Sequence, residues 1–269
     1  MFEKRKIILV IGVLMVLTAI SGLSYSITVY DQSRAVYSEA REEYLSKGSD
    51  EVREDAGKAG SPELTLSEDT AGSSEWWDQA EVDIDSLSAE YPEAVGWIWF
   101  EDGSISYPLM FSGDNGKYLF TDYKGDESRS GAIFIDEGSS PDLSDPHTLI
   151  YGHNMKDGSM FGSLKYFRTD GDYYKDHRYF QIITKDHKYR YLVFSYKEVP
   201  SDHMVYDVYG SDGAGLEEYL KEMEGSRPEG SVSVNDIDGS DSYVTLSTCT
   251  AANEKRFIVC GIRIDERAK

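Results

Sequence analysis

The stretch Tyr243-Val-Thr-Leu-Ser-Thr-Cys249 decides how the fold is interpreted, because it is typical of a buried strand with a thiol at its last position. The apolar run Arg256-Phe-Ile-Val-Cys-Gly-Ile-Arg-Ile264 follows after a short gap and begins with a cation. Far upstream, Tyr151-Gly-His153-Asn-Met supplies a histidine. A catalytic thiol needs a base or cation to hold it as thiolate, and its acyl intermediate needs an oxyanion donor. Cys249, His153 and Arg256 therefore predict acyl transfer on a thiolate.

Each of these three residues also has an ordinary interpretation. A cysteine in an apolar strand is usually a small buried hydrophobe. His153 is then a histidine in a turn, and Arg256 is a charge at a strand end. Cys249 and Cys260 are the two cysteines of the chain, and a disulfide between them is a further alternative. Because Cys260 stands in the middle of its apolar run, we interpret it as a core thiol.

The chain downstream of Trp76 reads mostly as short strands separated by Gly, Asp, Asn and Ser turns, which is typical of a closed β-barrel. Helices are predicted at 83–90, near 161–166, and at 215–224 in the long connection before the Cys249 strand. The predicted strands span 96–100, 105–110, 132–135, 147–151, 179–184, 188–199, 242–249 and 256–264.

Several segments together resemble the sortases, and their amino-acid sequences are most similar to those of class B. The most specific is Tyr151-Gly-His-Asn-Met-Lys-Asp-Gly-Ser-Met-Phe-Gly162. The resemblance covers roughly residues 80 to 266 and implies a mostly β, closed eight-stranded sortase-type barrel, with an N-terminal helix and a helix in the long loop before the Cys249 strand. The other matching segments are Asp83-Ile-Asp-Ser-Leu through Val95-Gly-Trp-Ile98, Tyr107-Pro-Leu, Asp114-Asn115 with Tyr118-Leu119, and Gly131-Ala-Ile-Phe-Ile-Asp136.

The resemblance also implies residue roles. Cys249 would attack a threonine carbonyl in a sorting signal, His153 would protonate the departing amine and deprotonate the incoming one, and Arg256 would hold the oxyanion. Some relatives carry an acidic residue directly after the cysteine, where this chain has Thr250, so a substrate contact of that acid does not transfer. The expected substrate-binding residues are Asn115, Leu119, Ser247, Thr248 and Thr250.

The function implied is a cysteine transpeptidase that cleaves an Asn-Pro-x-Thr-x-like signal of surface proteins and joins them to a peptidoglycan amine. A pilin polymerase, which uses a pilin lysine as acceptor, is the alternative within the family. A hydrolytic cysteine protease is a third interpretation. An anchored wall-binding barrel in which Cys249 is merely buried is the non-enzymatic one.

The amino terminus predicts membrane attachment. Residues 1–6 form a basic flank expected to be cytoplasmic, and the apolar segment 7–29 is expected to cross the membrane once as a signal anchor. A cleaved signal peptide is the alternative. Residues 30–75 are expected to form a juxtamembrane helix and a flexible stalk rich in Gly, Ser, Asp and Glu. Residues 76–269 are then the extracellular catalytic domain of a single-pass membrane protein.

Charge and composition limit the partners. The formal net charge of −22 argues against nucleic acid, because phosphate binding needs a basic surface. Two cysteines in an exported chain exclude a disulfide framework. The remaining histidines (His147, His177, His187 and His203) lack partners at metal-ligand spacing. A calcium site among the acids of 136–145 is a minor alternative, and no cofactor or metal is expected.

Overall fold

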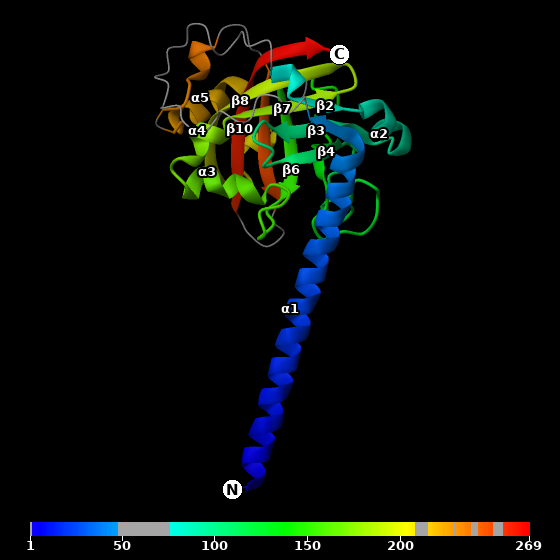
Figure 1. The fold of residues 1–269 in the computed structure, drawn as a ribbon. Coiled ribbons are helices and arrows are strands. Elements are labelled where there is room, and N and C mark those ends of the chain that lie inside the picture. Colours follow the sequence, from blue (N-terminus) through cyan, green and yellow to red (C-terminus); the bar gives the residue numbers. More distant parts are fainter. Residues whose placement is uncertain (1, 48–75, 208–214, 229, 238–241, 250–254) are drawn as a thin grey trace, which may run out of the picture. The chain divides into compact units, whose positions relative to one another are not determined.

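The computed structural model describes residues 2–47, 76–207, 215–228, 230–237, 242–249 and 255–269 (Figure 1). For part of the first helix, and for Lys47 and Cys249, it describes the backbone and not the side chain. The chain divides into two compact units, Met1–Glu39 and Ala40–Lys269. The second unit contains every strand found in the described residues, and all the candidate site residues fall within its range.

A closed barrel of eight strands forms the body of the second unit (Figure 1). Around the barrel the strands follow the order β10-β8-β7-β3-β4-β5-β6-β9, and β9 pairs with β10 to close it. The predicted fold class is therefore confirmed. The strands are β3 (Ala94–Phe100), β4 (Ser106–Met110), β5 (Ile133–Ile135), β6 (His147–His153), β7 (Tyr179–Thr184), β8 (His187–Pro200), β9 (Tyr243–Cys249) and β10 (Lys255–Ala268).

Two of the barrel's pairings are parallel, β4 with β5 and β6 with β9, and the others are antiparallel. Strands such as β3 and β4 have almost no exposed residue, which suits the apolar runs of their sequences. Gly96 allows β3 to approach β7 closely, because a Cβ there would lie 2.8 Å from the Ile183 carbonyl oxygen.

Short helices occupy the connections between the strands. The α-helices are α2 (Ile84–Glu90), α3 (Tyr166–Thr169), α4 (Tyr173–His177) and α5 (Leu216–Gly225). The 3-10 helices are η1 (Trp76–Asp78), η2 (Lys117–Leu119), η3 (Gly162–Lys165), η4 (Met204–Asp207) and η5 (Val234–Asp236). Helix α2 begins where Asp83 accepts a hydrogen bond from the Ser86 N–H at 2.9 Å, a side-chain cap of the kind that satisfies a first-turn donor.

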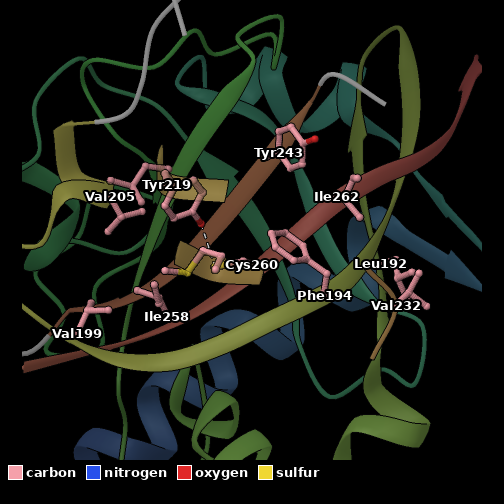
Figure 2. Packing of buried hydrophobic residues seen from close by; sticks show 12 residues of the cluster. Leu192, Phe194, Val199, Val205, Tyr219, Val232, Tyr243, Ile258, Cys260 and Ile262 are labelled. Carbon is pink, nitrogen blue, oxygen red and sulfur yellow. Dashed lines mark hydrogen bonds between the residues drawn. The ribbon is translucent and has the colours of Figure 1, made fainter. Parts of the chain in front are cut away.

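Helix α5 lies in the predicted place, in the connection between β8 and β9, and packs through a buried cluster (Figure 2). The Tyr219 hydroxyl lies 2.9 Å from the Cys260 sulfur and 2.5 Å from Thr245 Oγ1. His147 Nε2 meets the same threonine oxygen at 2.9 Å. One buried polar cluster therefore connects α5 with β6, β9 and β10. Cys260 is free and fully buried, which confirms it as a core thiol and excludes the disulfide alternative.

The long amino-terminal helix α1 spans Phe2–Tyr44. A transmembrane helix needs about 20 consecutive predominantly apolar residues. The strongly apolar run of this chain ends at Leu23, where Ser24, Ser26 and Thr28 follow. Within the part of the chain that the structure describes, no helix combines the length and apolar character needed to cross a membrane. The prediction of a single-pass anchor over 7–29, and with it the membrane localisation, is corrected accordingly.

The end of α1 and a three-residue strand belong to the same compact unit as the barrel. Strand β1 (Leu45–Lys47) pairs with β2 (Ala80–Val82). The nearly buried Tyr44 donates its hydroxyl to Glu90 at 2.8 Å, and its carbonyl accepts from the Asp83 N–H at 3.0 Å. We expect a fragment of residues 76–269 to be less stable than one of 30–269 by about 2 kcal/mol or more, since it loses a buried aromatic side chain and this pairing.

Urea unfolding of the two fragments measures that difference directly. A 30–269 fragment carrying Tyr44→Phe serves as control, because it loses the hydroxyl and keeps the strand pairing. Its stability should fall between those of the two fragments. Equal midpoints for 30–269 and 76–269 would place the stable boundary at residue 76, as the sequence predicts.

Candidate active site

The ends of three adjacent barrel strands bring the predicted catalytic residues to one rim. Strands β6 and β9 run parallel, and in their register His153 is the partner of Cys249. Neighbouring strands lie about 4.8 Å apart, so the backbones of these two residues are direct neighbours. Each is the last residue of its strand. The Cys249 side chain lies outside the described part of the chain.

Arg256 stands at the start of the next strand. In the β9–β10 pairing Ser247 is the partner of Ile258, and the same register continued by two residues sets Arg256 beside Cys249. A hydrogen bond of 2.9 Å from the Phe257 N–H to Thr248 Oγ1 agrees with that continuation. The Arg256 side chain is half-buried, with Nη1 3.4 Å from the Lys255 carbonyl oxygen. The fold therefore gathers residues about a hundred positions apart.

His153 is held by a backbone acceptor. Its Nε2 lies 2.9 Å from the carbonyl oxygen of Leu119. Because a carbonyl only accepts, Nε2 carries the hydrogen, and Nδ1 is the atom left to take or release a proton. Burial lowers the pKa of His153 from its ordinary value, and the bond to Leu119 opposes that shift without cancelling it. Burial therefore favours the neutral form of His153.

This depressed pKa predicts how stability depends on pH. As pH falls below about 6.5, the unfolded chain takes up the histidine proton before the folded one does. The stabilisation given by neutral His153 is therefore present above that pH and is lost as pH falls toward the folded-state pKa. We expect the free energy of unfolding, measured relative to His153→Gln, to fall between pH 7 and pH 5. A relative stability that rises on acidification would mean that the fold favours the imidazolium.

The predicted substrate-binding residues fall into two groups. Leu119 ends η2, is half-buried, and reaches His153 through its carbonyl. Ser247 and Thr248 precede Cys249 in β9 and are buried. The Thr248 hydroxyl accepts from the Phe257 N–H, so its side chain joins β9 to β10. These three residues lie at the rim that carries His153 and Cys249, and their substrate contacts stay predictions.

Asn115 lies against the turn that follows β5. Its Nδ2 donates to Asp136 at 2.8 Å, and its Oδ1 accepts from the Glu137 N–H at 2.9 Å. Asp136 also accepts a hydrogen bond from the Gly138 N–H. This carboxylate, one of the acids considered for a calcium site, therefore has protein partners. Thr250 lies outside the described residues. No structural contact tests the role predicted for either Asn115 or Thr250.

Two further residues at the rim were not identified from the sequence. The Tyr206 hydroxyl in η4 lies 2.9 Å from Ser247 Oγ, and its ring stacks on Tyr151, the residue paired with Ser247 in β6. Gly131 has a φ of 57°, and a Cβ there would meet His153 Cδ2 and the Leu119 carbonyl oxygen, each at 3.1 Å. An aromatic in a polar loop and a glycine in a turn are the only sequence signals that these residues give.

Comparison with known proteins identifies the family of this chain. The sortase domain model matches residues 113–264, which is more than half of the 269-residue chain. The chain belongs to the sortase family. Members of that family are cysteine transpeptidases. The matched range contains all eight of the residues predicted for the site.

Two relatives found by sequence comparison are class B sortases. Sortase B of Listeria monocytogenes is 34% identical over 159 residues, which cover 58% of this chain and 63% of that protein. The match thus spans less than two thirds of the listerial enzyme. Sortase B of Staphylococcus aureus is 27% identical over 181 residues, covering 65% of this chain and 72% of the other. These relatives confirm the class B resemblance.

Solved structures show the same barrel. A Bacillus anthracis sortase B complex has a TM-score of 0.64 and 26% identity, covering 89% of this chain and 99% of the other. A Staphylococcus aureus sortase B–substrate complex has a TM-score of 0.59 and 26% identity, covering 68% of this chain and 84% of the other. The fold predicted for this sortase is therefore shared with experimentally determined members.

Proposed function

We propose that this sortase cleaves a sorting signal near the carboxyl end of surface proteins and transfers them to an amine of cell-wall peptidoglycan. The observation that carries the proposal is the register of three neighbouring strands, which pairs His153 with Cys249 and, continued by two residues, sets Arg256 of β10 on the other side of Cys249. Membership of the sortase family supports the reaction class. An Asn-Pro-x-Thr-x-like signal is the substrate that we expect for a class B enzyme.

The proposed reaction has two half-reactions, and His153 carries the proton in each of them. The Cys249 thiol gives its proton to Nδ1 of His153 and attacks the threonine carbonyl carbon. The tetrahedral intermediate collapses, the carbon–nitrogen bond breaks, and the imidazolium returns its proton to the departing amine. A thioester remains on Cys249. An amine of the acceptor then attacks this thioester, His153 takes the amine proton, and the thiolate leaves and is reprotonated.

A neutral, half-buried His153 suits this cycle. With Nε2–H occupied by the Leu119 carbonyl, the ring presents one basic nitrogen, Nδ1, for both proton transfers. Arg256 supplies a cation and a planar fork of donors for the oxygen that becomes negative in each tetrahedral intermediate. The deprotonated thiol also gains from a guanidinium nearby, because a positive charge lowers a thiol pKa.

The proposed substrate path runs along the rim past Leu119, Ser247 and Thr248. Tyr206 and Tyr151 form an aromatic wall next to Ser247. The Staphylococcus aureus sortase B solved as a substrate complex is similar to this chain, which supports placing a substrate against the same strands. We propose surface proteins that bear the signal as one partner and a peptidoglycan precursor or cross-bridge amine as the other.

Mass spectrometry of the reaction products tests this proposal. The protein is incubated with a library of pentapeptide signals, with and without a peptidoglycan-like amine. We expect cleavage after threonine and, in the presence of the amine, a new amide product. Cleavage to the free acid alone, unchanged by the amine, would identify a hydrolase.

Two other outcomes distinguish the remaining alternatives. Covalent ladders on a pilin lysine would identify a pilin polymerase. A Cys249 that is inert to methanethiosulfonate reagents, in a chain that cleaves no peptide, would identify a wall-binding barrel.

A further inference from the structure

We propose that Tyr107 is a positioning residue for His153. Its hydroxyl fixes the backbone of Met160, and Met160 closes the loop that follows His153. This inference deepens the proposed function, since it rests on His153 as the acid–base residue of the site. Tyr107 stands in β4, two barrel strands away from β6.

The loop after His153 returns to its own starting point. Asn154 and Met160 form an antiparallel bridge, and the Phe161 N–H donates to the His153 carbonyl at 3.0 Å. The backbone of His153 is therefore bonded to the residue that follows Met160. A change in the Met160 backbone moves Phe161, and Phe161 in turn moves the His153 peptide.

Met160 has a backbone conformation that a methionine rarely adopts. Its φ is 54°, in the left-handed region, and its side chain is fully buried. Only glycine and, less often, asparagine or aspartate visit that region without strain. Such a residue persists where the surrounding structure holds it in place, and strained positions of this kind cluster at active sites. Gly158 in the same loop has a φ of 85°, so the chain uses a glycine nearby but not at this position.

The Tyr107 hydroxyl supplies the support. It accepts the Met160 N–H at 2.9 Å in a buried setting. A buried backbone N–H without an acceptor is costly, so this bond favours the strained conformation. The tyrosine itself is anchored on the barrel, because it pairs with Ile98 of β3 and lies under the Arg41 guanidinium at 5.9 Å. The acceptor is therefore fixed to the sheet and not to the loop.

Close packing leaves the loop little freedom to adjust. A Cβ on Gly152, the residue before His153, would lie 2.7 Å from the Phe161 ring and 2.4 Å from Ile133 Cδ1. The Phe161 ring therefore rests directly on the backbone of β6. On the far side, a Cβ on Gly162 would lie 2.2 Å from the Met155 carbonyl oxygen. A shift at Met160 is consequently transmitted to His153 and not absorbed by a gap.

Tyr107→Phe tests the proposal, with Tyr174→Phe as matched control. Both tyrosines are nearly buried, and each hydroxyl makes a 2.9 Å hydrogen bond to the backbone. Tyr174 bonds the Val193 carbonyl in β8, away from the His153 loop. Steady-state transpeptidation is measured across pH, together with the melting temperature. The side-chain ¹⁵N resonances of the five histidines are also recorded, with His153 assigned from His153→Gln.

We expect Tyr107→Phe to lower kcat on the order of 10-fold at unchanged KM, because a 1 Å misplacement of a reacting group can cost about 10²-fold. It should also shift the His153 resonance and the pH–rate limb that follows it. Tyr174→Phe should lose comparable thermal stability and leave kcat, the pH profile and that resonance unchanged. Equal kinetics and equal His153 resonances in the two variants would overturn the proposal.

A double-variant cycle covers the case in which Tyr107→Phe folds poorly. Met160→Gly keeps the N–H and adopts a positive φ without strain. In the Tyr107→Phe background it should recover part of the kcat that Tyr107→Phe alone loses, because glycine at position 160 no longer needs the support of the hydroxyl. Strictly additive effects would contradict the mechanism. If the unaltered protein shows no transpeptidation, the His153 resonance still decides the positioning role, so failure of the proposed function remains distinguishable.

Discussion

Cys249→Ala is expected to abolish peptide cleavage and amine transfer while leaving the barrel folded. The substitution removes the sulfur that would form the thioester, and no other described thiol can replace it. Cys260 is fully buried, and burial raises the pKa of its thiol to about 11. It therefore stays protonated at neutral pH. Mass spectrometry should detect the acyl-enzyme in the unaltered protein and none in Cys249→Ala.

Cys260→Ala is the matched control for that experiment. It also removes one thiol, but it takes a hydrogen-bond partner from Tyr219 inside the cluster that holds α5. We expect a lower melting temperature and nearly normal acylation. An active Cys249→Ala together with an inactive Cys260→Ala would reverse the assignment of nucleophile and core thiol.

Arg256→Lys is expected to slow acylation on the order of 10²–10³-fold, the usual loss when one preorganised oxyanion donor is removed. Lysine keeps the charge and cannot reproduce the planar fork of donors. Arg256→Ala should lose at least as much. Single-turnover acylation, followed by rapid quench and mass spectrometry, measures the step directly.

Arg263 provides the control on the same strand. Its guanidinium donates to the Leu143 carbonyl at 2.9 Å and lies 4.2 Å from the centroid of the Tyr189 ring. Arg263→Lys should therefore reduce stability and leave acylation intact. Near-normal acylation by Arg256→Lys would leave a Cys-His pair as the catalytic set.

Strands with strong apolar runs were predictable from the sequence. The strand at Tyr179–Thr184 has the predicted ends, and the β9 strand ends at Cys249 as predicted. The helix before β9 differs from its prediction by one residue at each end. In these segments periodicity and composition decide the structure locally, so a single sequence carries the information. The number and spacing of the strands already predicted a closed barrel, and the family resemblance agreed with that prediction.

Features that depend on distant partners were not predictable. Strand β1 has only three residues, Leu45–Lys47, and forms because β2 is available to pair with it. Strand β6 extends two residues beyond its prediction, to His153, because β9 continues beside it. The sequence could not predict that the Leu119 carbonyl accepts the hydrogen bond from His153, since every residue has a carbonyl. The predicted amino-terminal anchor was wrong, since no helix among the described residues has the length and apolar character needed to cross a membrane.

The parallel pairing of β6 with β9 has a consequence for the order of folding. Residues 154–242 lie between the two strands, so their pairing must wait until that whole segment has been closed into a loop. Contacts of such high sequence separation form slowly, because loop closure costs entropy before any pairing is gained. His153 and Cys249 become neighbours through this pairing alone. In a refolding experiment, regain of thiol reactivity at Cys249 should therefore lag behind regain of sheet signal, and it would time the closing of the barrel.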